Sequence, residues 1–230
     1  MRILQKSVLF LLALAGWSQG QSAEQIMAEV RQVAGMQQHQ DLDGIIKSRG
    51  KKRDFDMFLR GKEIHFRIDG GKDAFALRLG NNRQELFDTT SGSAKPFPNS
   101  KIAQPIAGTD VTYEDLAMKF LYWPNPEIAG EAKIKLQDCW RIHLQNPGNT
   151  GRYREVSVWV AKEQRALMRV IGYGPAPARA ALKQFEVLDI TRRNGVQTVG
   201  KLKIASFNQK GDQNGTTTID FGRPKRLGRR

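Results

Sequence analysis

The stretch IAGTDVTYEDLAMKFLYWPNP, residues 106–126, interrupts a chain that otherwise alternates apolar and polar residues as β-strands do. Within it, Thr112 can cap a helix through its hydroxyl, and Asp115 three residues later completes a capping-box pattern. Leu116 and Phe120 form an apolar stripe at helical spacing, and the following WPNP ends the helix because proline lacks an amide hydrogen. The stretch therefore predicts one mid-chain helix, which either closes an ordinary core or forms a lid over an apolar cavity.

On the N-terminal side of this stretch, an amphipathic helix is expected at residues 23–36, where apolar side chains recur at helical spacing. From Leu42 onward the period becomes two, and the turn sequences RGK at 60–62 and DGGK at 69–72 separate successive strands. The apolar residues of these strands are Phe55, Met57, Leu59, Ile64, Phe66, Ile68, Phe75, Leu77 and Leu79. We expect a further short strand at 84–88 and a loop at 89–107.

On the C-terminal side, the alternation resumes and continues almost to the end of the chain. Strands are expected around residues 132–136, 140–144, 153–161, 166–173, 182–192, 196–207 and 216–221. Together with the N-terminal part this makes about ten strands and two helices, without an internal repeat. The fold class predicted from these residues is mainly β (α+β), with one large, curved antiparallel sheet in a single domain.

The first residues are typical of a secretory signal. A basic n-region with Arg2 and Lys6 precedes the apolar run VLFLLALA at 8–15, which is too short to span a bilayer. Cleavage after residue 20 and cleavage after residue 22 both fit the small residues that follow. We therefore divide the chain into a signal peptide at 1–20, a folded domain at 21–222 and a basic tail at 223–230, and we expect a soluble periplasmic protein.

The composition excludes some classes of protein and leaves others open. The formal net charge is +14, and five positive charges lie in the last eight residues. In an exported protein such a charge favours anionic membrane surfaces or other polyanions as partners rather than nucleic acid. Mean hydropathy of −0.51 excludes a polytopic membrane protein. Cys139 is the single cysteine, so no internal disulfide is possible, and we expect a buried structural thiol.

Three stretches of the sequence resemble a known family. The first is GTDVTYEDL at 108–116, the second is DCWRIHL at 138–144 and the third is YREVSVWV at 153–160. In this order they resemble the outer membrane lipoprotein-sorting protein family, within the LolA/LolB-like superfamily of periplasmic lipoprotein carriers. The motif of that family is carried here by Gly108, Thr109, Asp110, Thr112, Tyr113, Glu114, Asp115 and Leu116.

The resemblance implies an incomplete (half) β-barrel whose concave apolar face is covered by helices. Members of the superfamily carry acyl chains of lipoproteins, or other lipids, in that space. The true carriers also use an arginine to lock the lid, and the sequence alone assigns this role to no position. For a ligand-binding apolar cavity we predict a lining of Met57, Leu59, Ile64, Phe66, Phe75 and Leu77, with Leu116 and Phe120 on the lid, although each could equally belong to a solid core.

The sequence lacks the usual signatures of catalysis. His39, His65 and His143 are far apart, without metal-ligand spacing, and no GxSxG, HExxH, P-loop or GxGxxG motif is present. The adjacent acids Glu114 and Asp115 do not face each other on a helix, and capping explains them. We therefore expect no enzyme, no metal and no cofactor.

The function predicted from the sequence is binding of acyl chains or lipids in the periplasm, in lipoprotein sorting or in lipid transport toward the outer membrane. A membrane-bound partner protein could then supply or receive the ligand. One alternative is an envelope sensor or interaction module that uses the same half-barrel without transport. A weaker alternative is a polyanion-binding envelope protein that uses the basic surface.

Overall fold

The computed structural model describes residues 21–35, 41–81, 83–148, 150–175, 180–193 and 196–224. The predicted signal peptide and all but the first two residues of the predicted basic tail lie outside these ranges, as does His39. The assignment of these two segments therefore stays a prediction.

One antiparallel sheet of 13 strands dominates the described part of the chain, in the order β6-β5-β4-β3-β2-β1-β13-β12-β11-β10-β9-β8-β7. The strands of its first half are β1 (Asp41–Ser48), β2 (Lys51–Arg60), β3 (Glu63–Ile68), β4 (Asp73–Leu79), β5 (Gln84–Asp88) and β6 (Lys95–Pro96). Those of its second half are β7 (Glu127–Ile134), β8 (Gln137–Gln145), β9 (Glu155–Ala161), β10 (Leu167–Tyr173), β11 (Ala181–Arg193), β12 (Val196–Phe207) and β13 (Gln213–Pro224). The predicted mainly-β class is confirmed.

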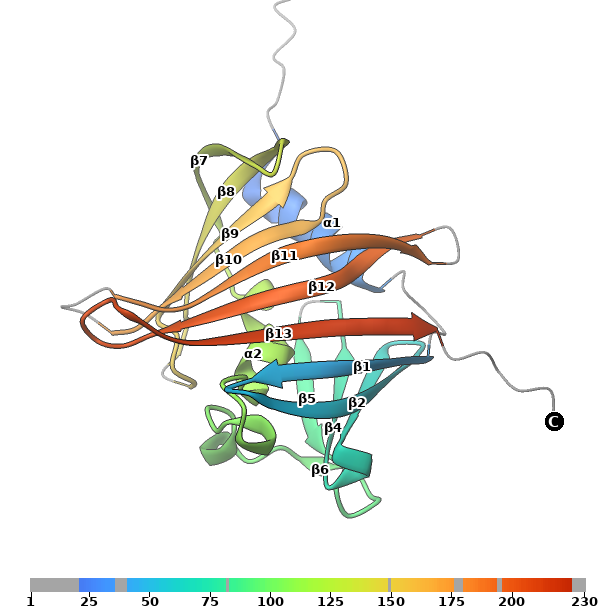
Figure 1. The fold of residues 1–230 in the computed structure, drawn as a ribbon. Helices are drawn as coiled ribbons and strands as arrows, with labels where there is room; N and C mark the ends of the chain where they lie inside the picture. The colour runs from blue at the N-terminus through green and yellow to red at the C-terminus, as the bar shows by residue number, and fades with distance from the viewer. Residues whose placement is uncertain are drawn as a thin grey trace, which may run out of the picture.

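The two halves of the sheet are joined by the first and the last strand. Ile46 of β1 lies opposite Ile219 of β13 in an antiparallel ladder, and both side chains are almost fully buried. Each half is a meander that runs outward from this seam, so the sheet ends at β6 on one side and β7 on the other and does not close into a barrel. Figure 1 shows the strong twist that brings the β1–β6 half under the β7–β13 half.

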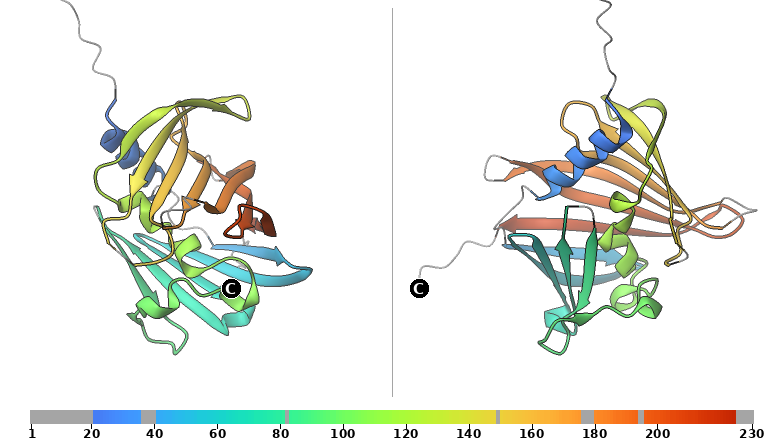
Figure 2. Two further views of the ribbon diagram at one scale, coloured as in Figure 1. Left: turned by 90° about the vertical axis from the view of Figure 1, so that its left-hand side faces the viewer. Right: turned by 180° about the vertical axis from the view of Figure 1, so that it is seen from behind.

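The first helix, α1 (Ala23–Gly35), confirms the predicted amphipathic helix. Ile26, Met27 and Val30 are buried and belong to the same hydrophobic cluster as side chains of the sheet. The view from behind in Figure 2 shows α1 lying across the strands of the second half of the sheet. The stretch at residues 106–126, called the central segment from here on, lies on the same side of the sheet.

The central segment is helical, but its helix is shorter than predicted. Thr112 and Asp115 form the expected capping box at the start of α2 (Tyr113–Ala117), so the predicted helix start is confirmed. The α-helix does not reach Phe120, because Met118 adopts a left-handed conformation with φ of 49°. A separate 3₁₀ turn, η4 (Lys119–Tyr122), follows and ends before the two prolines as expected. The kink rotates the second turn, so Leu116 and Phe120 do not share one continuous helical stripe.

The predicted strand pattern is largely confirmed, with local corrections. Phe55, Met57 and Leu59 are all buried on one face of β2, and the turn at 60–62 connects β2 to β3. The structure has 13 strands rather than about ten, mainly because long stretches such as 41–60 fold into hairpins. Leu136 was expected in a strand, but it lies in the β7–β8 turn with positive φ and is 87% exposed.

The segment predicted as a loop, residues 89–107, contains short ordered elements. These are β6 and the single-turn 3₁₀ helices η2 (Asn99–Lys101) and η3 (Ile106–Gly108). A third such turn, η1 (Asp69–Gly71), occupies the predicted turn between β3 and β4. Ile102 and Ile106 are buried in the main cluster, so this segment packs on the sheet although its sequence is rich in Ser, Pro, Gly and Lys.

Candidate functional site

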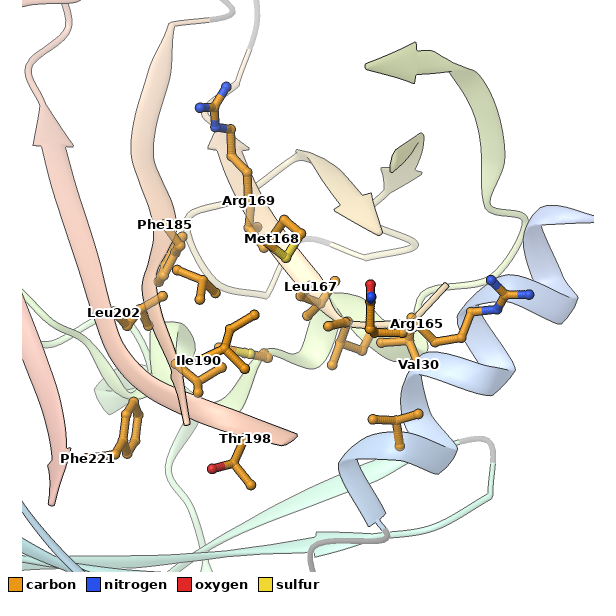
Figure 3. Close-up of a pocket in the computed structure, with 18 residues that line it drawn as sticks. Val30, Arg165, Leu167, Met168, Arg169, Phe185, Ile190, Thr198, Leu202 and Phe221 are labelled. Atoms are coloured by element: carbon orange, nitrogen blue, oxygen red, sulfur yellow. The ribbon is translucent and has the colours of Figure 1, made fainter. Parts of the chain in front are cut away.

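An apolar pocket of about 390 Å³ lies between α1, the central segment and strands β10–β12 (Figure 3). Its size falls within the range of about 300–1,000 Å³ that is usual for small-molecule sites. The lining residues are Val30, Val33, Met118, Leu121, Gln164, Arg165, Ala166, Leu167, Met168, Arg169, Val170, Phe185, Val187, Ile190, Thr198, Val199, Leu202 and Phe221. Most are aliphatic or aromatic, so the pocket suits a ligand with a hydrocarbon body.

The second half of the sheet supplies one wall of the pocket through its alternating pattern. Val170 of β10 pairs in register with Phe185 of β11, and Val187 of β11 pairs with Leu202 of β12. These four side chains are buried in the main hydrophobic cluster, on the face of the sheet that meets α1. Ile190 continues this wall but is 41% exposed, which places it at an open side of the pocket.

Two arginines hold α1, which forms one wall of the pocket, in place. Arg165, in the β9–β10 turn, forms an ion pair with Glu29 of α1 and donates to Oε1 of Gln21 at 2.9 Å. Its guanidinium also lies over the ring of Trp140, 4.8 Å from the centroid. From α1 itself, Arg31 donates to the backbone carbonyl of Leu121 at 2.7 Å. These contacts fix α1 to strand turns on one side and to the central segment on the other.

The cavity residues predicted from the sequence lie in a different place. Met57, Leu59, Phe66, Phe75 and Leu77 are buried, and Ile64 is packed against them, in the core under the first half of the sheet. Phe66 stacks on Phe75 with ring centroids 4.7 Å apart. None of these six, and neither Leu116 nor Phe120, lines the 390 Å³ pocket. As ligand contacts they remain predictions; the structure shows them as packing neighbours.

Only a very small void is left among the predicted residues. Phe66 and Leu116 border a space of about 10 Å³, together with Ile46, Phe55, Ile68, Ile219 and Phe221. Such a space is about the size that one water molecule needs. The predicted residues thus lie in a closely packed part of the core, whereas the 390 Å³ pocket is lined mainly by the second half of the sheet.

The family motif forms a buried polar cluster. Asp115 is fully buried, accepts hydrogen bonds from the Thr112 backbone amide and the Tyr153 hydroxyl, and pairs with Lys183 of β11. Glu114 is also buried, and its carboxylate accepts the backbone N–H of Arg152 at 2.8 Å. The capping role predicted for Asp115 is confirmed, but both acids do more than cap: they attach the central segment to β11 and to the connection between β8 and β9.

Burial and charge change the pKa of groups in this cluster. Burial is the main cause that raises the pKa of Tyr153 well above its usual value, and the neighbouring charge of Asp115 acts in the same direction. Burial also raises the pKa of Glu114, although its two backbone hydrogen bonds oppose the change. The sequence placed Tyr153 in the third stretch of the resemblance but did not pair it with Asp115, 38 positions away. It gave no signal for Lys183, because a lysine in a strand does not reveal a buried ion pair with a residue 68 positions away.

The neighbouring motif residue Asp110 binds the sheet at its central seam. Its carboxylate pairs with Arg49 at 2.5 Å and accepts from Ser48 of β1 at 3.2 Å. Thr217 of β13 donates to Ser48 at 2.8 Å. Thr109 is buried as well, and its hydroxyl donates to the carbonyl of Ile106 at 2.8 Å. The motif therefore positions the central segment over the β1–β13 junction, and the pocket opens beside it.

Cys139, His65 and His143 take the places expected for structural residues. Cys139 is fully buried in a second, small cluster with Ile134 and Trp159, and burial raises the pKa of its thiol. His65 lies 3.1 Å from Glu63, and His143 lies 3.8 Å from Glu155. The described ranges contain no group of three or more His, Cys, Asp or Glu placed to hold a metal ion.

Comparison with solved structures defines the class of fold. A DUF1329 family protein from Desulfovibrio piger superposes with a TM-score of 0.65 at 14% identity, covering 91% of this chain and 96% of that chain. A LolA superfamily protein from Nitrosomonas europaea gives 0.64 at 13% identity, with coverage of 92% and 96%. A putative outer membrane lipoprotein-sorting protein domain from Vibrio parahaemolyticus gives 0.62 at 14% identity, with coverage of 88% and 93%. The chain therefore has the same fold as these three proteins.

Sequence comparison places the chain in a family. A family model described as "Uncharacterized protein" matches residues 71–224, more than half of the chain, and the chain belongs to that family. The matched range starts within the first half of the sheet and includes the whole 108–116 motif. The fold that the resemblance implies is confirmed by the structural neighbours, which include a LolA superfamily protein and a putative outer membrane lipoprotein-sorting protein domain. No curated protein matched the sequence.

A membrane-spanning helix is absent from the part of the chain that the structure describes. Neither α1, with 13 residues, nor the shorter helical turns are long and apolar enough to cross a bilayer.

Proposed function

We propose that this protein is an exported, periplasmic carrier that binds the acyl chains of lipoproteins or lipids and moves them toward the outer membrane. The observation that carries the proposal is the apolar 390 Å³ pocket between α1, the central segment and β10–β12. Support for export comes from the signal-like residues 1–20. The shared fold supplies a precedent, because one structural neighbour is a putative outer membrane lipoprotein-sorting protein domain.

The pocket chemistry is sufficient for a hydrocarbon ligand without a catalytic group. Burial of one methylene is worth about 0.8 kcal/mol, so a chain of about 16 carbons would gain on the order of 12 kcal/mol before the costs of ordering it. A pocket of this volume holds part of such a chain, and the rest would leave through the open side at Ile190. Tight binding then follows from apolar contact alone.

Release requires a wall that moves, and α1 is the candidate. In this proposal α1 and the central segment are the helices that cover the concave face of the sheet. The Arg165–Glu29 pair and the bond from Arg31 to the Leu121 carbonyl hold α1 closed. Both are contacts at the protein surface or in its partly buried layer, whose net stabilisation is small enough to break during a transport cycle.

The first test is binding of a fluorescent fatty-acyl methyl ester to the protein without residues 1–20, and its loss in Ile190→Glu. Ile190 lines the pocket and is 41% exposed, so a carboxylate there should leave the fold intact while its charge disrupts the apolar wall. The matched control is Leu188→Glu on the same strand, which has the same exposure but lies outside the lining. We expect at least tenfold weaker binding in Ile190→Glu only.

A second test separates a carrier from a sensor. Protein purified from its native envelope is analysed by native mass spectrometry and lipid extraction, and loaded protein is then mixed with acceptor vesicles. Transfer of the bound lipid to the vesicles supports the carrier. Saturable binding without transfer would favour the sensor or interaction module, and absence of both co-purified lipid and probe binding would reject the carrier proposal.

A further inference from the structure

Two residues of the described pocket lining have a buried polar atom without a hydrogen-bond partner, the Nε of Arg169 and the hydroxyl of Thr198, and Thr198 is the uncharged one. Its side chain is 4% exposed and lines the pocket from β12, yet its hydroxyl has no hydrogen-bond partner. Figure 3 shows the hydroxyl directed from β12 toward the side of the pocket where Phe221 lies. Buried polar groups almost always have a partner, and an unpaired one is destabilising. A valine would fill the same space without this cost.

The position of Thr198 in the strand does not account for the hydroxyl. Thr198 pairs in register with Thr191 of β11, and an irregularity of the ladder follows at Gly200. Gly200 is approached closely by Asp189, whose carboxylate would clash with any side chain there. The bulge explains why the strand turns Thr198 and Val199 toward the pocket, but it supplies no acceptor for the hydroxyl. A ligand in the pocket could supply one.

The charged residues of the pocket lining restrict the charge that a ligand can carry. The guanidinium of Arg165 is engaged by Glu29, Gln21 and the Trp140 ring. Arg169 turns to the opposite face of the sheet, where it pairs with Glu186 at 3.6 Å and lies over Trp159. The Nε of Arg169 has no hydrogen-bond partner, but its guanidinium lies with Glu186 and Trp159 on the opposite face of the sheet from Thr198. Among the described lining residues, no cation therefore faces a carboxylate beside Thr198. A buried charge without a partner is strongly disfavoured.

We infer that the pocket selects neutral acylated ligands, and that the Thr198 hydroxyl donates to the ester or amide carbonyl of the bound acyl group. This inference rests on the proposed function, and it names the ligand class: acyl esters or amides rather than free fatty acids or plain hydrocarbons. The carbonyl satisfies the unpaired hydroxyl, while the chain lies against Val187, Leu202 and Phe221.

The test compares three probes of equal chain length: methyl laurate, laurate and dodecane, each displacing a fluorescent apolar dye from the protein. In the wild type we expect laurate at pH 8 to bind at least tenfold more weakly than methyl laurate. In Thr198→Val we expect about three- to tenfold weaker binding of methyl laurate, since one neutral hydrogen bond is lost. Dodecane should bind equally to both proteins, and Thr198→Ser should restore the affinity for the ester.

The outcomes distinguish this inference from the proposed function. An equal loss for methyl laurate and dodecane in Thr198→Val would show a purely structural role for Thr198 and overturn the inference. Laurate binding as tightly as its ester would overturn the selection of neutral ligands. In both cases the pocket would still bind hydrocarbon. If none of the three probes displaces the dye from the wild type, the proposed function itself fails and the inference falls with it.

Discussion

At the scale of single residues, the most consequential contact is the buried pair between Asp115 and Lys183. The two side chains are 0% and 5% exposed, and Lys183 also donates to the backbone carbonyl of Asp110. Such a pair adds little net stability compared with an apolar core, because both charges have lost their hydration. Removal of one partner is costly, since the other charge stays buried alone.

We predict that Lys183→Met lowers the free energy of unfolding by about 3–5 kcal/mol, because it leaves the Asp115 carboxylate without its counter-charge. The measurement is urea denaturation followed by circular dichroism. Lys201→Met is the matched control, since Lys201 on the next strand pairs with Asp220 at 3.5 Å on the surface. The control should cost less than about 1 kcal/mol. Equal effects of the two substitutions would contradict the role of the buried pair.

Tyr153 gives a second prediction, on alkaline stability. Because the pKa of Tyr153 is raised in the folded protein, the native state keeps this proton above pH 10, where an unfolded tyrosine loses it. The stabilisation is complete below about pH 10 and falls above it by up to about 1.4 kcal/mol per pH unit. In Tyr153→Phe this contribution is absent, so stability between pH 10 and 11.5 should decline less steeply than in the wild type. An unchanged slope would show that Tyr153 does not titrate in this way.

At the scale of elements, the position of α1 decides whether the pocket is closed. The apolar face of α1 packs on the sheet through Ile26, Met27 and Val30, while Glu29 and Arg31 make its polar contacts. The central segment holds its place by a different means, through the buried acids at the start of α2. The helical wall is thus fixed firmly at the motif and more weakly at α1.

We predict that Arg165→Ala increases the rate at which a bound fluorescent fatty-acyl methyl ester dissociates, by roughly three- to tenfold, because one charged contact of α1 is lost. Stopped-flow competition measures this rate, and hydrogen exchange of α1 should become faster in parallel. Arg83→Ala is the control, since Arg83 pairs with Glu85 on the distant strand β5. Faster dissociation without a change in α1 exchange would contradict the assignment of α1 as the moving wall.

At the scale of the whole molecule, the pairing of β1 with β13 makes one sheet from two meanders. The polar link through Asp110, Ser48 and Thr217 and the apolar pair Ile46–Ile219 both lie at this seam. Each half therefore depends on the other for the burial of its innermost strand. Figure 1 shows β13 and β1 side by side across the middle of the molecule.

We predict that the described domain unfolds in a single cooperative transition. Trp123, Trp140 and Trp159 report on the central segment and the second half of the sheet, whereas far-ultraviolet circular dichroism reports on all strands. The two urea transitions should coincide, because the halves share a continuous ladder. A fluorescence transition clearly separated from the dichroism transition would show that the halves unfold independently.

The local pattern of the sequence determined the strand faces, the first hairpin and the start of the central helix. The period of two in 55–59 and 64–68 predicted buried strand faces, and the turn residues at 60–62 placed the hairpin correctly. Thr112 and Asp115 predicted the capping box, and the 108–116 motif indicated the fold. These features depend on residues within a few positions of one another, so their physical causes are visible in the chain itself.

The tertiary structure alone decided where the pocket lies. The left-handed Met118 shortened the helix, and the order of the strands put Phe185, Val187 and Leu202 opposite α1. It also buried Asp115 against Lys183 and left Thr198 facing an apolar space. These outcomes depend on contacts between residues far apart in the chain. An apolar strand face looks the same in sequence whether it meets a solid core or a cavity, because only the packing of the opposite layer distinguishes the two.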